Sequence, residues 1–180
     1  MFHTYRIVIL MTILSMVLFS CSGSDDGGSQ GTQEVFLQCK INGQLRHFNY
    51  RANANDGPSG DKVHFVVISG WEGDDMATSP GFGINMVLPE GATETTYIAS
   101  GGLEPELDGK YFYQNYVNGQ NVGTTVYSGG ISEGTHFKLT ITSLTAWGVK
   151  GKFSGLLRLS GGDEVIQITD GEFSAPYNYQ

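Results

Sequence analysis

The chain has 180 residues, of which 10 are Lys or Arg and 18 are Asp or Glu, so its formal net charge is −8. A chain this acidic is a poor candidate for binding nucleic acid, which needs clustered basic side chains. The length that follows an N-terminal signal is enough for one domain that can bury a core without disulfides.

Residues 1–20 have the features of a secretory signal peptide. Arg6 precedes an apolar run over residues 7–19, which is shorter than the roughly 20 residues that cross a bilayer. A stretch rich in Ser, Gly and Asp follows, and such a composition is typical of a flexible tether. We therefore expect a signal peptide at 1–20, a tether at 21–33 and a single β domain at 34–180.

The residues around Cys21 resemble the lipobox of bacterial lipoproteins. Leu18 lies three residues before Cys21, and the small Ser20 lies directly before it. The resemblance implies that the Cys21 thiol carries a diacylglycerol, that acyl chains such as palmitate anchor the protein, and that it lies on the outer membrane. Asp25 and Asp26 resemble the surface-export signal of Bacteroidota lipoproteins, although a solvated linker explains them equally well. The cell surface and the periplasmic face therefore both stay open.

From residue 34 onward, apolar and polar residues alternate with period two, which is typical of half-buried strands. Asn42-Gly43 and Asn118-Gly119 predict hairpins, because a type I′ turn needs positive φ at both positions. Gly151 and Gly155 predict bulges or strong coiling within one strand. We expect strands at 34–41, 45–50, 62–69, 82–88, 95–99, 111–117, 122–127, 137–142, 149–159 and 164–169.

No stretch shows the 3.6-residue apolar repeat of a helix. We therefore predict an all-β fold, an antiparallel β-sandwich of about nine to ten strands. The alternative is a closed or partly open lipocalin-like β-barrel.

Both ends of the domain resemble a family of uncharacterised Bacteroidota lipoproteins. Members end in an "sG-x-F-s-G" strand and an "I-T-x-G-x-F" strand, which match residues 151–155 and 168–173. The opening hairpin, from Phe36 to Gly43, fits as well, whereas the middle matches poorly. The resemblance implies the location and the β-rich fold, and it implies no activity.

Few residues have the spacing of a catalytic or metal site. His47, His64 and His136 lie far apart in the sequence, so we interpret them as unrelated. Cys39 has no partner if Cys21 is lipidated, and its alternating context predicts a small buried apolar residue. We expect no cofactor and no metal. Weak candidates for Ca²⁺ are three carboxylates of one loop: Glu72, Asp74 and Asp75.

Aromatic residues are the best candidates for ligand binding. Trp71 and Trp147 each lie next to glycine, and Tyr113 lies in a strand rich in tyrosine. Exposed aromatic rings can stack on sugars, whereas the alternative is that Trp147 caps the core and the tyrosines line it. Our preferred hypothesis is a non-enzymatic binding module for a glycan or an envelope protein, with an exposed aromatic patch beside Trp71 or Trp147.

Two other hypotheses stay open. A carrier of an apolar small molecule would enclose a void between strand faces that carry Val63, Phe65, Phe153 and Leu157, with Gly151 and Gly155 making room. A small hydrolase would use paired carboxylates. The candidates for such a pair lie in loops: Glu72, Asp74, Asp75, Glu104, Glu106 and Asp108.

Overall fold

A computed structural model describes residues 33–54, 64–99 and 105–178 of the chain. They belong to one compact unit, Gln33–Gln180. The predicted signal peptide, Cys21, the pair Asp25-Asp26, and Val63 and Glu104 lie outside the described residues. In the part of the chain that the structure describes, no helix is long and apolar enough to cross a membrane.

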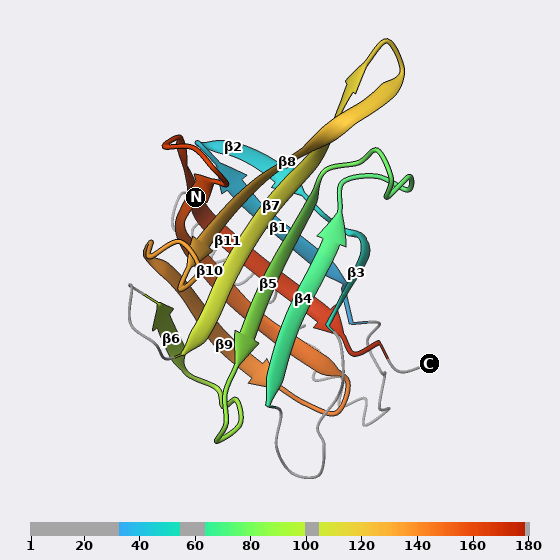
Figure 1. Ribbon diagram of the computed structural model, residues 1–180. Helices are drawn as coiled ribbons and strands as arrows, with labels where there is room; N and C mark the ends of the chain where they lie inside the picture. The colour runs from blue at the N-terminus through green and yellow to red at the C-terminus, as the bar shows by residue number, and fades with distance from the viewer. Residues whose placement is uncertain (1–32, 55–63, 100–104, 179–180) are drawn as a thin grey trace, which may run out of the picture. The chain divides into compact units, whose positions relative to one another are not determined.

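Eleven antiparallel strands form one sheet (Figure 1). In chain order they are β1 (Phe36–Ile41), β2 (Gln44–His47), β3 (Tyr50–Ala54), β4 (Phe65–Trp71), β5 (Gly81–Val87), β6 (Thr96–Ala99), β7 (Glu106–Val117), β8 (Gln120–Gly130), β9 (Phe137–Leu144), β10 (Gly148–Leu159) and β11 (Val165–Pro176).

The sheet folds over into two layers (Figure 1). The front layer has the order β8-β7-β5-β4-β3, and the back layer has the order β2-β1-β11-β10-β9-β6. β10 joins the layers, because its first part pairs with β9 and its end, Arg158 and Leu159, pairs with β8. The sheet is not closed into a barrel. The prediction of an all-β, sandwich-like fold is therefore confirmed, and the closed form of the barrel alternative is wrong.

Local signals predicted the turns better than the strand ends. Asn42 and Gly43 have φ of 48° and 83°, and Asn118 and Gly119 have 52° and 78°, as type I′ turns require. The strand count is higher than predicted because residues 44–54 form two strands. β7 begins at Glu106, inside a stretch that composition indicated to be a loop.

β11 continues through Asp170 and Gly171, where a strand end was predicted. Asp170 adopts a φ of 50°, and the register with β10 shifts between Phe153 and Gly155 so that β11 holds one extra residue. The bulge predicted from the glycines of β10 is therefore present, but the extra residue lies on β11.

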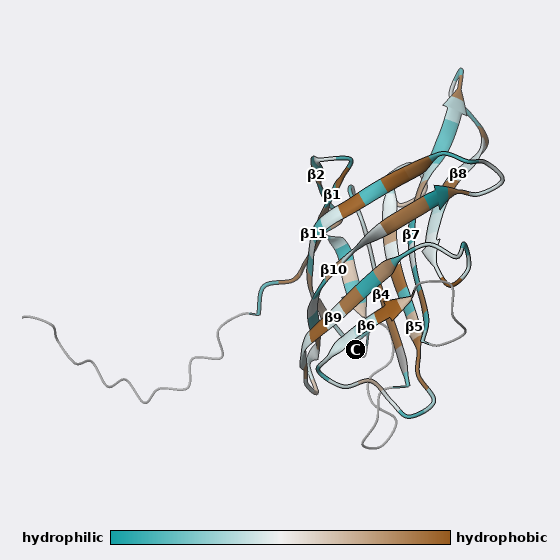
Figure 2. Ribbon diagram, turned by 90° about the vertical axis from the view of Figure 1, so that its left-hand side faces the viewer, coloured by the Kyte–Doolittle hydropathy of each residue, from teal (hydrophilic) through white to brown (hydrophobic). Residues whose placement is uncertain are grey.

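The hydropathy of the strands alternates as the sequence pattern indicates (Figure 2). The inward side chains of both layers form one core, whose centre is Phe153 of β10. Its ring centroid lies 5.1 Å from that of Phe82 of β5, and 6.3 Å from those of Phe137 of β9 and Phe173 of β11. Aromatic contacts therefore join the two layers.

Glycines make the space that these rings occupy. A Cβ at Gly151 would lie 2.7 Å from the Phe173 ring, and one at Gly155 would lie 2.6 Å from the Phe137 ring. The two residues expected to open a cavity for a carrier therefore accommodate phenylalanine rings instead.

β7 and β8 extend beyond their neighbours as a two-stranded hairpin (Figures 1 and 2). β5 pairs with β7 only as far as Phe112, and β10 pairs with β8 only at Tyr127 and Ser128. Tyr116, near the tip, is 42% exposed.

Replacing Gly155 with Ala should destabilise the fold. The new Cβ would lie 2.7 Å from the His136 carbonyl oxygen as well as close to the Phe137 ring, so both backbone and core must shift. We expect a loss of about 1–3 kcal/mol in the free energy of unfolding, measured by urea denaturation.

Gly83→Ala is the matched control. The nearest atom to a Cβ there is the Ile68 carbonyl oxygen at 3.6 Å, which is ordinary contact, so stability should change little. Equal effects of the two variants would contradict this account of the core.

Candidate ligand-binding site

Trp71 points away from the core. In β4, Val66, Ile68 and Gly70 are buried, whereas Val67, Ser69 and Trp71 alternate with them and are partly exposed. Trp71 is the last residue of the strand, so its ring lies on the outer face of the front layer, near one end.

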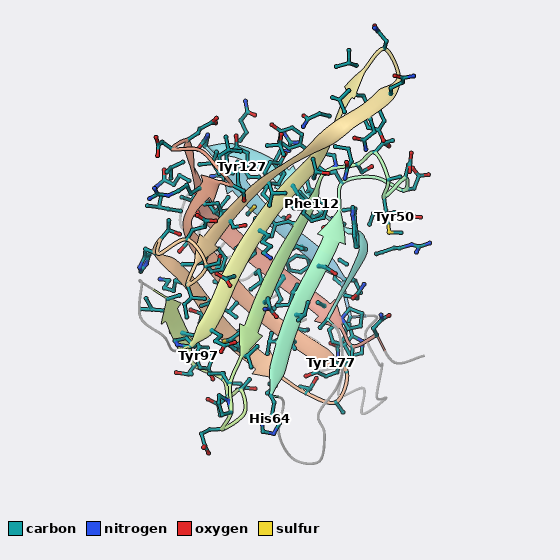
Figure 3. The ribbon with its side chains drawn as sticks, in the orientation of Figure 1. Tyr50, His64, Tyr97, Phe112, Tyr127 and Tyr177 are labelled. Atoms are coloured by element: carbon teal, nitrogen blue, oxygen red, sulfur yellow. The ribbon has the colours of Figure 1, made fainter. Side chains whose placement is uncertain are left out.

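Trp71 belongs to a row of aromatic residues that crosses the front layer. It pairs with Tyr50 of β3 on one side and with Gly81 of β5 on the other, and Gly81 pairs with Phe112 of β7. A Cβ at Gly81 would lie 2.4 Å from Phe112 Cζ, so the missing side chain lets the Phe112 ring cover this position. Figure 3 labels Tyr50 and Phe112 at the two ends of the row.

A groove of about 470 Å³ lies beside Trp71. It is lined by Arg51, Ala52, Asn53, Trp71, Met76 and Asn178. Two residues of β3 oppose one of β4 between Tyr50 and Asn53, and Arg51 has a φ of 49°, so an edge-strand bulge forms one wall.

The groove combines an aromatic ring with polar groups. Asn53 Nδ2 donates to the Arg51 carbonyl oxygen at 2.6 Å, and the Arg51 guanidinium lies 5.8 Å from the Tyr50 ring centroid. We refer to the surface formed by the lining residues together with Tyr50 as the Trp71 groove. Such a surface can contact the apolar face of a ligand while amide and guanidinium groups bind its hydroxyls.

Trp147 lies elsewhere, in the turn between β9 and β10. Its backbone N–H donates to Thr145 Oγ1 at 3.3 Å, and the ammonium of Lys150 lies 5.5 Å from its ring centroid. Trp147 is partly exposed, beside the outer face of the back layer. The patch expected beside one of the two indoles is therefore best developed at Trp71.

Tyr113 packs with other tyrosines. Its ring centroid lies 5.7 Å from that of Tyr111, which in turn lies 6.3 Å from that of Tyr127. Tyr111 and Tyr127 are buried, and Tyr113 packs against the core. Tyr113 therefore lies on a different face from Trp71, and no ring contact joins it to either indole.

The acidic loop residues have other partners. Glu72 accepts two hydrogen bonds from Arg46, the second from Nη2 at 2.9 Å. Asp75 accepts from the Ala77 backbone N–H at 3.0 Å and from Thr78 Oγ1 at 2.8 Å, whereas Asp74 is exposed. Among the described residues, no group of three or more His, Cys, Asp or Glu is placed to hold a metal ion. The weak calcium candidates therefore do not converge.

The histidines also lie apart. His47 ends β2, His136 precedes β9, and His64 Nδ1 lies 3.2 Å from the Leu88 carbonyl oxygen. Asp108 Oδ1 accepts from the Ser132 backbone N–H at 2.9 Å. The three histidines therefore belong to different elements, and the His64 and Asp108 side chains contact backbone groups.

No protein-family model, curated protein or solved structure matches the chain. The resemblance to Bacteroidota lipoproteins stays a prediction.

Sequence reasoning missed the neighbours of Trp71. Tyr50, Gly81 and Phe112 are brought to it only by strand register, across separations that no local pattern reveals. The expected strands, 62–69 and 82–88, stopped short of Trp71 and Gly81, so the sequence offered no signal for this pairing.

Cys39 should not react with thiol reagents in the folded protein. Its side chain is 0% exposed. Burial raises the pKa of the thiol to about 12, although the positive charge of nearby Arg46 acts in the opposite direction. In a Cys21→Ser variant, where Cys39 is the only thiol, a maleimide at pH 8 should label the protein only in denaturant. Rapid labelling of the folded variant would contradict this assignment.

Proposed function

We propose that the protein is a non-enzymatic binding module, held on the outer membrane by a lipid on Cys21, and that it binds a glycan in the Trp71 groove. The observation that carries the proposal is the position of Trp71, partly exposed in a groove of about 470 Å³ beside Tyr50. A sugar ring has an apolar face and a rim of hydroxyls, and the groove offers an aromatic face with amide and guanidinium groups near it.

The charge of the groove favours a neutral or weakly acidic ligand. Arg51 is the only charged residue among the described residues that line it, and Asn53 and Asn178 add neutral amides. This composition suits hydroxyl groups better than it suits a highly charged polymer.

The competing hypotheses have less support. The hydrolase hypothesis needs paired carboxylates, but Glu72, Asp75 and Asp108 form hydrogen bonds with Arg46 or with turn residues. The carrier hypothesis needs space beside Gly151 and Gly155, but the rings of Phe173 of β11 and Phe137 of β9 occupy that space.

The lipid anchor can be tested by removing its attachment site. Two acyl chains hold a soluble domain on a membrane stably, so the Cys21→Ser variant should move from the membrane fraction to the soluble fraction of the cells. Cys39→Ala is the control, because the buried Cys39 takes no part in anchoring, and this variant should stay with the membrane. A Cys21→Ser variant that also stays would overturn the anchor proposal.

Binding in the groove can be tested with Trp71→Ala. After a glycan array has identified a ligand, we expect this variant to bind it at least about tenfold more weakly by calorimetry, because the stacking surface is lost. Val122→Ala is the control, since Val122 is 61% exposed on the β7–β8 hairpin, and its affinity should be unchanged.

Two results would contradict the glycan proposal. One is equal affinity of the Trp71→Ala variant and the native protein. The other is that no glycan binds, whereas cross-linking in cells captures an envelope protein at the Trp71 groove, which would favour the protein partner.

A further inference from the structure

The outer face of the back layer holds most of the lysines of this acidic chain. Four of the six lysines in the sequence, Lys40, Lys138, Lys150 and Lys152, lie on β1, β9 and β10. In β9 and β10 the inward residues are buried, and the lysines alternate with them and face outward. The face therefore concentrates positive charge within a protein of net charge −8.

Three of these lysines form a regular arrangement with hydroxyl groups. Lys138 pairs with Ser154, Lys152 pairs with Thr140, and Lys150 pairs with Ser143 beside the bulged Thr142. Successive outward rows on a strand lie about 6.5–7 Å apart, so each of three neighbouring rows presents one ammonium and one hydroxyl. We call Lys138, Lys150, Lys152, Ser154, Thr140 and Thr142 the lysine ladder.

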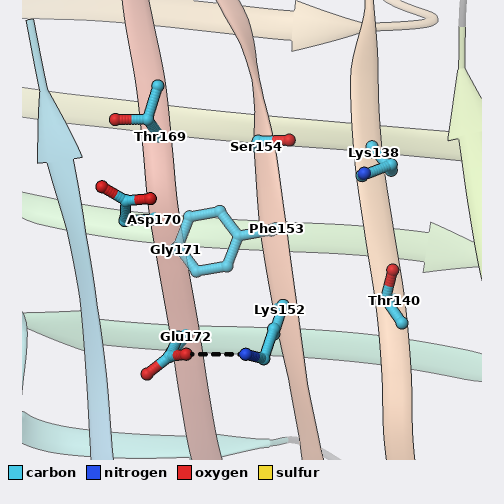
Figure 4. A pocket seen from close by; sticks show the side chains of 9 residues that line it. All are labelled: Lys138, Thr140, Lys152, Phe153, Ser154, Thr169, Asp170, Gly171 and Glu172. Atoms are coloured by element: carbon cyan, nitrogen blue, oxygen red, sulfur yellow. Dashed lines mark ion pairs between the residues drawn. The ribbon is translucent and has the colours of Figure 1, made fainter.

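Two neighbouring grooves follow the lysine ladder. The first, of about 390 Å³, includes Lys138, Thr140, Lys152 and Ser154 (Figure 4). The second, of about 340 Å³, includes Thr142 and Lys150. Lys152 and Glu172 line both grooves, so the two are adjacent along β10.

A buried hydroxyl lies in the second groove without a partner. Ser174 is 3% exposed, and its Oγ makes no hydrogen bond with the part of the chain that the structure describes. It lines the groove between Lys150 and Phe36. Buried hydroxyls are normally hydrogen-bonded. Unlike the exposed lysines, this group gains a partner only if a ligand or water enters the groove.

Acidic neighbours limit what this face can bind. Glu172 forms an ion pair with Lys152 at 3.0 Å, and Asp170 forms one with Lys40 at 2.9 Å, while Glu34 lines the second groove. Exposed ion pairs of this kind contribute little to stability, so the Lys152 ammonium can give up Glu172 and contact a ligand instead. Among the described residues, no ion pair holds Lys138 or Lys150.

We propose that the lysine ladder binds a linear glycan that carries carboxylate groups at regular intervals. The ammonium groups contact the carboxylates, the hydroxyls of Thr140, Thr142 and Ser154 contact ring hydroxyls, and Ser174 Oγ gains its missing partner. This site lies on the opposite layer from the Trp71 groove and does not depend on the function proposed there.

Other polyanions fit this face less well. Closely spaced phosphates of a nucleic acid or an anionic bilayer would meet Glu34, Asp170 and Glu172 as well as the lysines. Binding to such surfaces needs a larger uninterrupted basic cluster. A glycan with spaced carboxylates can place its charges beside the ammoniums and its neutral hydroxyls beside the acids.

The experiment compares the binding of polygalacturonate with that of its methyl-esterified form, which has the same backbone without the charge. The full chain should bind polygalacturonate, should bind the ester at least about tenfold more weakly, and should lose affinity as salt is raised. Lys138→Gln and Lys150→Gln should each weaken binding about fivefold to tenfold. Both side chains lie on the outer face, and thermal melts establish that the variants are folded.

Lys110→Gln is the matched control. Lys110 is exposed on β7, on the other layer, so this variant has the same net charge as the others and should bind as the native chain does. Four results would overturn the proposal: no binding of polygalacturonate, equal binding of the ester, equal losses for all three variants, or tighter binding of DNA or anionic vesicles. A Trp71→Ala variant should keep polygalacturonate binding, which separates this site from the Trp71 groove.

Discussion

The packing of phenylalanine rings against glycines is the constraint on which the rest of this structure depends. Phe153 contacts rings from both layers, and it can do so only because Gly171, which pairs with it on β11, has no side chain to meet its ring. Gly151 and Gly155 likewise leave space for the rings of Phe173 and Phe137, respectively. Because these glycines have no side chain, the rings pack directly against the neighbouring strands, and the core is dense. The same arrangement fixes register, because a slip by one residue would place each ring against a side chain.

Because side chains fill the core in this way, ligands have access to the protein from its outer faces. The inward side chains near the centre are aromatic or aliphatic and contact one another, so polar ligands have access from outside. The two outer faces differ in chemistry. The front layer presents an aromatic row beside a groove whose described lining carries one charge, that of Arg51. The back layer presents lysines with hydroxyls and interspersed carboxylates. Each face therefore suits a different class of ligand, and neither requires the core to open.

The sequence predicted the class of fold because that information is local. Alternation indicated which residues face inward along β9 and β10, and Asn-Gly pairs indicated two turns whose φ values the structure confirms. The sequence did not predict that β11 continues through Asp170. A bulge at this position depends on how β11 pairs with β1 and β10, and this pairing is not local information. The same limit applies to the sites. Trp71 could be singled out by type, but Tyr50 and Phe112 reach it through cross-strand pairing, and the lysine ladder appears only once Lys138 is known to face Ser154.

The acidity of the chain and the basic character of one face are consistent with each other. As it approaches, a polyanion meets the repulsion of a protein of net charge −8, which acts within the screening length of about 8–10 Å. That repulsion disfavours non-specific adhesion of nucleic acid and anionic surfaces. Only a polymer whose acid groups match the positions of Lys138, Lys150 and Lys152 gains enough short-range contacts to offset it. The carboxylates among the lysines then act as a filter, because they repel any polyanion whose charges fall beside Glu34, Asp170 or Glu172.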